Sequence, residues 1–137
     1  MIPKMNPSIK TLWLSALRSG DYIQGTSFLQ HQGDYCCLGV LSDIAVKHDV
    51  TSWVTENNVT YGLYEPSLSN IEIGVPTEPV LQWAGLSMAN PSLLVKMSEL
   101  SRNTDFPDKF ESIRISDLND LHNFTFLQIA DLIEEQL

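Results

Sequence analysis

The sequence predicts a single compact domain of the α+β class, predominantly helical and with a small antiparallel sheet. Two segments with clear helix boundaries and apolar stripes, residues 7–19 and the C-terminal stretch, predict helices at both ends. Residues 21–32 and parts of 50–75 lack a helical period and are rich in strand-forming side chains. A chain of 137 residues that is 43% hydrophobic and 18% charged is large enough to bury one core without disulfides.

The first helix is bounded at both ends by residues that start and stop helices. Asn6 supplies an N-cap, and Pro7 stands at the first helical position. Arg18 lies in the last turn, and Gly20 is placed to end the helix. One face carries the apolar side chains of Ile9, Leu12, Trp13, Ala16 and Leu17. We therefore expect a helix over residues 7–19 that buries this face.

Residues 21–32 are expected to form a short hairpin or two extended segments, followed by a helix over residues 35–48. Asp34 stands where a residue that caps this second helix would lie. Cys37 shares one helical stripe with the apolar side chains of Val40, Leu41, Ile44 and Ala45. Cys37 is thus expected in the core. Cys36 lies about 100° round the helix, near its start, where the preceding hairpin should partly shield it.

The middle of the chain is expected to mix short strands with short helices. The stretches TSWV, VTYGLY and IEIGV, within residues 50–75, are candidate strands joined by turns. Thr77 and Gly85 bound a short helix that opens with an acidic residue and a proline. Asn90 and Pro91 repeat the N-cap and proline pattern, which predicts another short helix carrying Leu93, Met97 and Leu100.

The last helix has the clearest boundary in the sequence. Thr125 and Gln128 stand at the spacing of a capping box, in which each side chain bonds the backbone of the other residue. One apolar stripe follows, made by Phe126, Ile129, Ala130, Ile133 and Leu137. We expect the first, second and last helices to build the core, with Trp13, Leu41 and Ile129 inside it.

Charge narrows the range of partners. A formal net charge of −9 argues against direct nucleic-acid binding, because phosphate contacts need clustered lysines and arginines. No Lys or Arg falls between Asp49 and Val95, whereas five acidic residues do: Asp49, Glu56, Glu65, Glu72 and Glu78. A solvated acidic face is the simpler interpretation, and a surface for a basic partner is the alternative.

The sequence also bears on compartment. No apolar run approaches the ~18 residues of a membrane span, and the N-terminal MIPKMNPSIK lacks the apolar stretch of a signal peptide. The two cysteines are adjacent, and neighbouring cysteines join only through a strained ring, so a disulfide framework is not expected. We expect reduced thiols in a cytoplasm, no membrane association, and either a monomer or a homo-oligomer.

The adjacent Cys36 and Cys37 admit several chemical interpretations. A thiol at a helix N-terminus is a candidate nucleophile, with Gln24 as an oxyanion donor and a histidine base chosen from His31, His48 and His122. Asp34 opposes thiolate formation, so packing is the preferred role of both cysteines. Structural zinc needs four ligands at other spacings, and phosphate-binding glycine motifs are absent from the sequence. The sequence therefore predicts neither a metal site nor a cofactor.

Four stretches of the chain resemble a family of small uncharacterised proteins of bacteriophages and prophages. They read WLSALRSGDYIQGTSFL, DYCCLGVLSDIA, VPTEPVLQWAGL and LNDLHNFTFLQIADLIE. The family pattern contains W-x-x-A-L-R-S-G, then C-C-L-G-V-L, then L-N-D and I-A-D-x-I-E. The resemblance covers most of the chain outside residues 49–76 and 87–112. If the family shares a binding site, the resemblance implies that its polar residues here are Arg18, Gln24, Asp34, Asn119 and Asp120.

The chain departs from this pattern at two places. Ser42 stands where the family often has a third cysteine, which weakens a metal or redox role for the pair. In the closing motif His122 and Asn123 replace the usual x-Gly, and Thr125 replaces a serine. The matching polar residues also have structural interpretations: Arg18 and Asp34 as helix caps, and Asn119 with Asp120 as a turn.

The function that these observations favour is that of a non-enzymatic phage accessory protein in the cytoplasm of the infected bacterium. It would bind a host protein or a small host signalling molecule, to blunt defence or redirect metabolism. One alternative is a cysteine-dependent hydrolase or transferase that uses Cys36 with Gln24 and a histidine such as His48. Another alternative is a virion or assembly component.

Overall fold

Helices and short strands alternate along the chain, and the structure, a computed structural model, describes residues 4–57, 59–65, 70–100 and 105–137. The helices are α1 (Pro7–Ser19), α2 (Cys37–Lys47), α3 (Glu78–Ala84), α4 (Ile115–Asp120) and α5 (Phe126–Gln136), with a 3-10 turn η1 (Met97–Glu99). The strands are β1 (Ile23–Gln24), β2 (Gln30–His31), β3 (Asp34–Tyr35), β4 (Trp53–Glu56), β5 (Val59–Glu65), β6 (Asn70–Glu72), β7 (Ser92–Lys96) and β8 (Phe110–Arg114).

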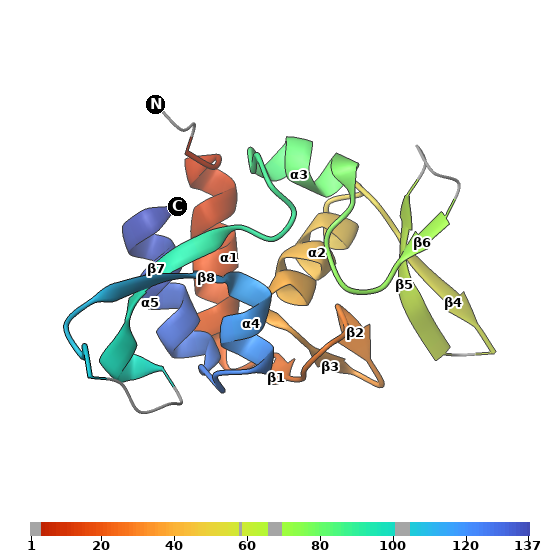
Figure 1. Cartoon of the computed structure of the whole chain (residues 1–137). Helices are drawn as coiled ribbons and strands as arrows, with labels where there is room; N and C mark the ends of the chain where they lie inside the picture. The colour runs from red at the N-terminus through yellow and green to blue at the C-terminus, as the bar shows by residue number, and fades with distance from the viewer. Residues whose placement is uncertain (1–3, 58, 66–69, 101–104) are drawn as a thin grey trace.

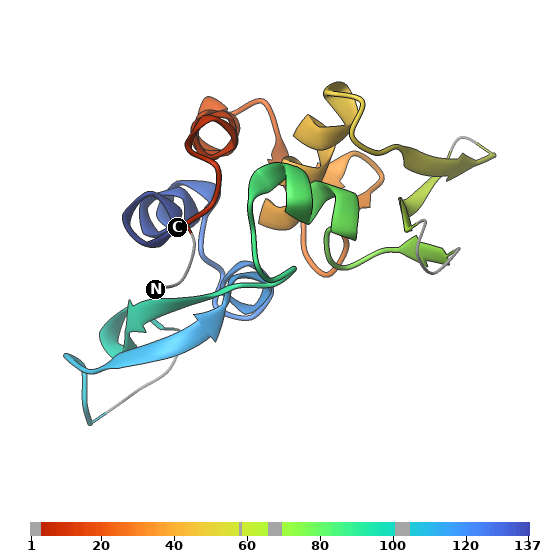
Figure 2. The same ribbon diagram turned by 90° about the horizontal axis from the view of Figure 1, so that it is seen from above.

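The elements divide the molecule into two ends (Figure 1). α1, α4 and α5 gather with β7 and β8 at one end, while β4, β5 and β6 project at the other. Figure 2 shows α1 and α5 side by side, and α2 and α3 between this helical end and the β4–β6 sheet. Helices and strands together enclose one core, so the α+β class and the single compact domain are confirmed.

The terminal helices form as their sequences predict. At α1, Oδ1 of Asn6 accepts from the backbone N–H of Ser8 at 2.9 Å, and Gly20 ends the helix with φ of 79°. At α5, Thr125 and Gln128 make both hydrogen bonds of the capping box. The three expected core residues, Trp13, Leu41 and Ile129, are fully buried.

α2 begins two residues later than predicted, and Asp34 is not its cap. Asp34 lies in β3, and the N-cap is Cys36, whose Sγ accepts from the N–H of Gly39 at 3.3 Å. Gly39 also permits a close approach, because a Cβ there would collide with the backbone carbonyl of Leu29. This approach brings the first turn of α2 against the chain just before β2.

The strands form three sheets, so the expectation of one small antiparallel sheet is confirmed only in part. β1, β3 and β2 make one sheet in which β1 and β3 run parallel, whereas β4, β5 and β6 make another that is antiparallel throughout. The two are joined by a hydrogen bond of 2.8 Å from the N–H of Leu29 to the carbonyl of Ile73. With three sheets, the expectation of a predominantly helical fold holds only in part.

The third sheet corrects the helix that was expected after Asn90. Residues Ser92–Lys96 form β7, which pairs with β8 in an antiparallel register. Asn90 does act at a helix N-terminus, but at that of α4: its Oδ1 accepts from the N–H of Ser116 at 3.1 Å, and its Nδ2 donates to the hydroxyl of Ser116 at 2.7 Å. Asn90 therefore bonds the start of a helix, as its residue type predicts, but that helix is α4 and not the segment that directly follows Asn90.

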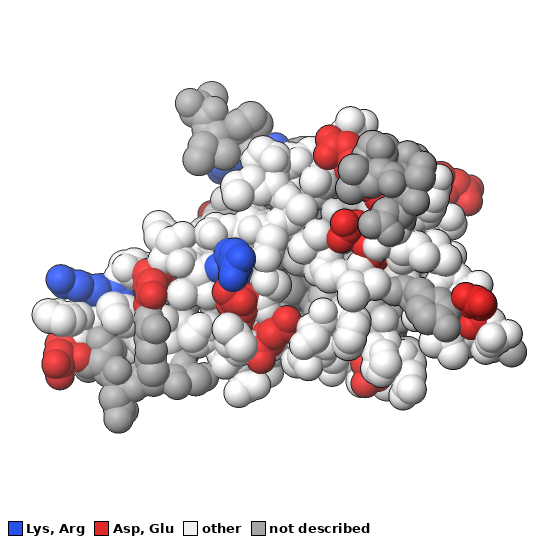
Figure 3. Space-filling model, turned by 45° about the vertical axis from the view of Figure 1, so that its right-hand side comes forward, with Lys and Arg blue, Asp and Glu red and all other residues white. Residues whose placement is uncertain are grey.

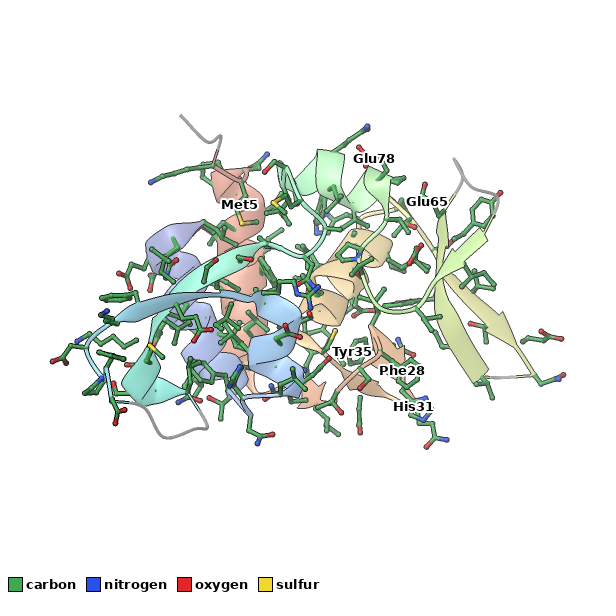
Figure 4. The ribbon with its side chains drawn as sticks, in the orientation of Figure 1. Met5, Phe28, His31, Tyr35, Glu65 and Glu78 are labelled. Atoms are coloured by element: carbon green, nitrogen blue, oxygen red, sulfur yellow. The ribbon has the colours of Figure 1, made fainter. Side chains whose placement is uncertain are left out.

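α3 forms as predicted between Thr77 and Gly85, although Thr77 makes no capping bond through its side chain. The carboxylate of Glu65 on β5 takes that place and accepts from the N–H of Glu78 at 2.9 Å. Figure 4 shows Glu65 and Glu78 close together between the sheet and the helix. Among the described residues, none of the helices has the length and apolar composition needed to cross a bilayer.

Candidate functional site

Gln24 and Asn119 form the centre of a polar cluster that joins segments distant in sequence. Nε2 of Gln24 donates to Oδ1 of Asn119 at 2.9 Å and to the carbonyl of Phe124 at 2.7 Å. Oε1 of Gln24 accepts from the N–H of Phe126 at 3.2 Å. One side chain on β1 thereby holds the end of α4 and the start of α5.

Asn119 uses its whole amide group in the same cluster. Its Oδ1 accepts from Gln24 and also from the backbone N–H of Cys37 at 3.3 Å. Its Nδ2 donates to the carbonyl of Gly25 at 2.8 Å and to Oδ1 of Asp120 at 2.7 Å. A primary amide has two donor hydrogens and two acceptor lone pairs, so Asn119 has no hydrogen-bonding capacity left for a ligand. It is also buried, with 2% of its surface exposed.

Asp120 extends this cluster to the loop after β1. Its Oδ1 accepts from Asn119 and from the backbone N–H of Ser27 at 3.1 Å. Ser27 has a positive φ of 72°, a conformation that costs energy for a residue with a side chain, and the bond to Asp120 helps to hold it. Gln24, Asn119 and Asp120, three of the five residues that the family resemblance pointed to, therefore meet in space.

The other two residues of that set lie elsewhere. Arg18 is on α1, where it donates to Asp131 at 2.8 Å and to Glu134 at 2.9 Å and so ties α1 to α5 rather than capping a helix. Asp34 is half-buried on β3, where it pairs with Ile23 and His31 in the strand register. The structure thus does not assemble the five residues into one site.

The two thiols lie beside the cluster and are buried. Cys37 is fully enclosed, and its carbonyl accepts from Nε1 of Trp13 at 2.9 Å. Burial raises the pKa of the Cys37 thiol well above its ordinary value, and the neighbouring Cys36 adds to the shift. Burial also raises the pKa of Cys36 to about 11, although the N–H of Gly39 pulls the other way. Cys37 meets the expectation of a core residue, and Cys36 is shielded more completely than expected.

The candidate base His48 stands far from Cys36. Cys36 is the N-cap of α2 and His48 is the C-cap, so the 11 residues of the helix separate them. From Cys36 to His48 the chain rises 12 steps, and at 1.5 Å per residue this is roughly 18 Å along the helix axis. His48 is exposed and tilts against the ring of Trp83 at 5.7 Å between centroids. A thiol needs its base within hydrogen-bonding distance, and this geometry does not supply it.

A hollow of about 200 Å³ opens at the edge of the cluster. It is lined by Gln24, Thr26, Asn119, Asn123 and Phe124. Asn123 has a φ of 57°, in the left-handed region that favours glycine. Since the amides of Gln24 and Asn119 are used inside the protein, this hollow offers a ligand mainly Thr26 and Asn123.

A second polar cluster surrounds Asp43, and nothing in the sequence analysis pointed to it. Oδ2 of Asp43 accepts from the hydroxyl of Tyr22 at 2.6 Å and lies 3.3 Å from Nζ of Lys47. Its Oδ1 accepts from Nε1 of Trp53 at 3.0 Å. Partial burial and the bond to Asp43 raise the pKa of Tyr22 to about 12. The only signal in the sequence is an acidic residue inside the apolar run of the second helix.

Aromatic rings complete this second cluster. Tyr35 meets Tyr22 edge-on at 4.9 Å and Trp53 at 6.3 Å between centroids. The cluster thus anchors β4 to α2 and β1, and it fixes the base of the projecting sheet. Phe28 stacks on His31 at 5.1 Å nearby, and Figure 4 shows both next to Tyr35.

The part of the chain that the structure describes contains no cluster of side chains that could bind a metal ion. No three side chains among its histidines, cysteines, aspartates and glutamates lie close enough together to hold an ion. The expectations of no metal and no cofactor stay predictions. What the described polar clusters do is cross-link the fold.

One comparison with known protein families gave a match that covers nearly the whole chain. A family model described as "Domain of unknown function (DUF8296)" matches residues 5–137. No curated protein and no solved structure matches the chain.

Proposed function

Because this chain belongs to the DUF8296 family, whose description assigns no activity, we propose its function from its own residues. We propose a non-enzymatic phage accessory protein that acts in the cytoplasm of the infected bacterium by binding a host protein. The phage context comes from the resemblance of its four sequence stretches to phage and prophage proteins. Binding as the mode of action comes from the distribution of charge and from the state of the polar groups.

The observation that carries this proposal is the charge of the end built by β4–β6 and α3. Figure 3 shows Asp and Glu there, and no Lys or Arg among the described residues of that half of the face. Of the five acidic residues between Asp49 and Val95, Glu65 is buried and bonded to the start of α3. The other four, Asp49, Glu56, Glu72 and Glu78, are at least partly exposed. A one-sign surface of this kind favours association with a basic protein partner.

The polar groups of the described clusters support binding over catalysis. The amides of Gln24 and Asn119 are committed to internal hydrogen bonds, and the thiols of Cys36 and Cys37 are buried with raised pKa values. A nucleophile is useful as a thiolate that substrate can reach. Cys36 meets neither condition, so the hydrolase or transferase is the weaker candidate.

The test is affinity capture from infected host cells, with the tagged protein as bait and mass spectrometry of both the proteins and the small molecules retained. A stoichiometric host protein that elutes at raised salt supports the proposal. A small signalling molecule retained without a host protein contradicts the proposed protein partner. Stable incorporation into virions, measured on purified particles, contradicts it in favour of an assembly role.

A further inference from the structure

The β4–β6 sheet has one face toward the core and one face toward solvent. Directly opposite residues of paired strands point to the same face, so the register sorts the side chains. Trp53 pairs with Leu63 and Leu63 with Glu72, and this face includes the fully buried Leu63. Val54 pairs with Gly62 and Tyr64 with Ile71, which places these residues on the opposite face. The register shifts between Val54 and Thr55, and beyond this irregularity Glu56, two residues after Val54 on the same strand, pairs with Val59 on this face.

We call this opposite side the outer face and define it by Val54, Glu56, Val59, Tyr64 and Ile71. Tyr64, Ile71 and Val59 are 44%, 39% and 46% exposed. Gly62 lies between them without a side chain, and a Cβ there would collide with the backbone carbonyl of Glu72 on the neighbouring strand. Three exposed apolar side chains, the half-buried Val54 and the carboxylate of Glu56 thus share one face of the sheet. Exposed apolar side chains gathered on one face mark interaction sites more often than scattered single residues do.

We propose that the outer face docks a basic amphipathic helix of a partner protein, an inference that rests on the binding function proposed above. A helix is an element that covers an apolar sheet face well, because its own apolar stripe packs against the sheet. The occupant must also suit the charge of the surroundings. Glu56 lies on the outer face itself, and no Lys or Arg falls between Asp49 and Val95 in the sequence.

The same charge argues against a second copy of this chain as the occupant. Two outer faces brought together would bring two copies of Glu56 into one contact with no basic residue of either face to pair with them, and like charges in contact oppose association. A helix with lysines or arginines beside its apolar stripe would meet the carboxylates instead. Basic residues beside an apolar stripe are also what distinguishes this partner from an ordinary hydrophobic one.

A synthetic peptide tests the surface without prior identification of the host protein. The probe is a helical peptide of about 18 residues with leucine at positions i, i+3, i+4 and i+7 and lysine elsewhere. The matched probe has glutamate in place of every lysine. We expect the lysine peptide to bind the full-length protein and the glutamate peptide not to bind. Backbone amide shifts on binding should cluster on β4, β5 and β6, and the affinity should fall as salt rises.

Two variants with matched controls locate the contact. Ile71→Ser should weaken peptide binding by about tenfold or more, as loss of a central apolar anchor does. Leu127→Ser, at an apolar residue of α5 that is 58% exposed, is its control and should not change the affinity. Glu56→Lys should also weaken binding, whereas Glu135→Lys makes the same change of net charge on α5 and should have little effect. Glu56 lies on an exposed strand end, so its replacement tests the surface even where Ile71→Ser disturbs β6.

Several outcomes would overturn the inference. One is that the wild type, Ile71→Ser and Glu56→Lys all bind the lysine peptide with the same affinity. The others are that the peptide shifts backbone amide signals outside β4–β6, or that the affinity does not change with salt. A dimer in sedimentation that Ile71→Ser dissociates would assign the face to a second copy and refute the basic helix. If Ile71→Ser and Glu56→Lys still capture the host protein that the wild type captures, the outer face is not the binding surface, and the proposed function stands. If wild type captures no host protein but binds the peptide on the outer face, the surface assignment stands and the proposed function fails.

Discussion

Nε2 of Gln24 donates to Oδ1 of Asn119 at 2.9 Å, across 95 positions of the sequence. This bond joins the strand after the first helix to the short helix that precedes the last one. Each of the two amides also bonds backbone groups of other elements: Phe124, Phe126, Cys37 and Gly25. Gln24 and Asn119, which the family resemblance suggested as binding residues, are here cross-links of the core.

Removal of either amide should therefore destabilise the fold. Asn119→Leu leaves the N–H of Cys37 and the carbonyl of Gly25 without this partner, and each buried unpaired group costs about 1–3 kcal/mol. We expect the urea unfolding midpoint to fall clearly for both Asn119→Leu and Gln24→Ala. Gln82→Ala, at an exposed glutamine of α3, is the control and should stay within about 0.5 kcal/mol of wild type. An unchanged midpoint for Asn119→Leu would show that water replaces these bonds.

Both thiols should react slowly with a thiol reagent in the native protein and quickly once it is unfolded. Cys37 is fully buried and Cys36 is 4% exposed, and the pKa of each thiol is raised. Cys36→Ser should leave the folded protein and its binding intact, because serine is itself a good N-cap. Cys37→Ser should lower stability by placing a hydroxyl in the core. Rapid labelling of native Cys36 at neutral pH, with loss of function in Cys36→Ser, would instead favour the cysteine enzyme.

Stability should fall at alkaline pH. The pKa of Cys36 rises from 9.0 to about 11 on folding, and that of Tyr22 rises from 10.0 to about 12. A group whose pKa is raised by folding stabilises the fold fully below its unfolded pKa, and this contribution is lost as pH rises toward the folded pKa. The contribution of these two groups to the unfolding midpoint should thus be constant below about pH 9 and decline between about pH 9 and 12. Cys36→Ser and Tyr22→Phe should each make the decline of the unfolding midpoint with pH shallower. If both variants decline as steeply as the wild type, these two groups do not cause the loss of stability.

Ile129→Ala should cost about 2–5 kcal/mol of stability, since the side chain is fully buried between the helices of the core. Leu127→Ala, two residues away on the exposed side of α5, is the matched control. Urea unfolding followed by circular dichroism gives both values. Equal midpoints for the two variants would mean that α5 contributes little to the core.

The helical part of this fold could be predicted because helix signals are local. The caps Asn6 and Thr125 and the stripes that follow them act within one or two turns, so α1 and α5 were predicted with nearly the right bounds. Burial of Cys37 followed from the same helical period. Asn90 shows the limit of such signals, because its capping group serves α4, 26 positions away, and the residues after it pair with β8 as a strand.

For the candidate site, the sequence allowed a prediction of some of the residues but not of their hydrogen bonds. Gln24, Asn119 and Asp120 do meet, but no spacing in the sequence shows that their hydrogen bonds are used within the protein. The cluster around Asp43 could not be predicted because Asp43, Tyr22 and Trp53 lie in three separate segments of the chain.

The sequence by itself determined the terminal helices, the burial of Cys37 and the acidic stretch without Lys or Arg, because these depend on neighbours along the chain. Only the tertiary structure decided the three sheets, the burial of Cys36 and the outer face of β4–β6. The pairing of strands and the hydrogen bonds of buried polar side chains depend on groups far apart in sequence. Which side of a strand faces the core is set by its register with another strand, and here that register turned Tyr64 and Ile71 toward solvent.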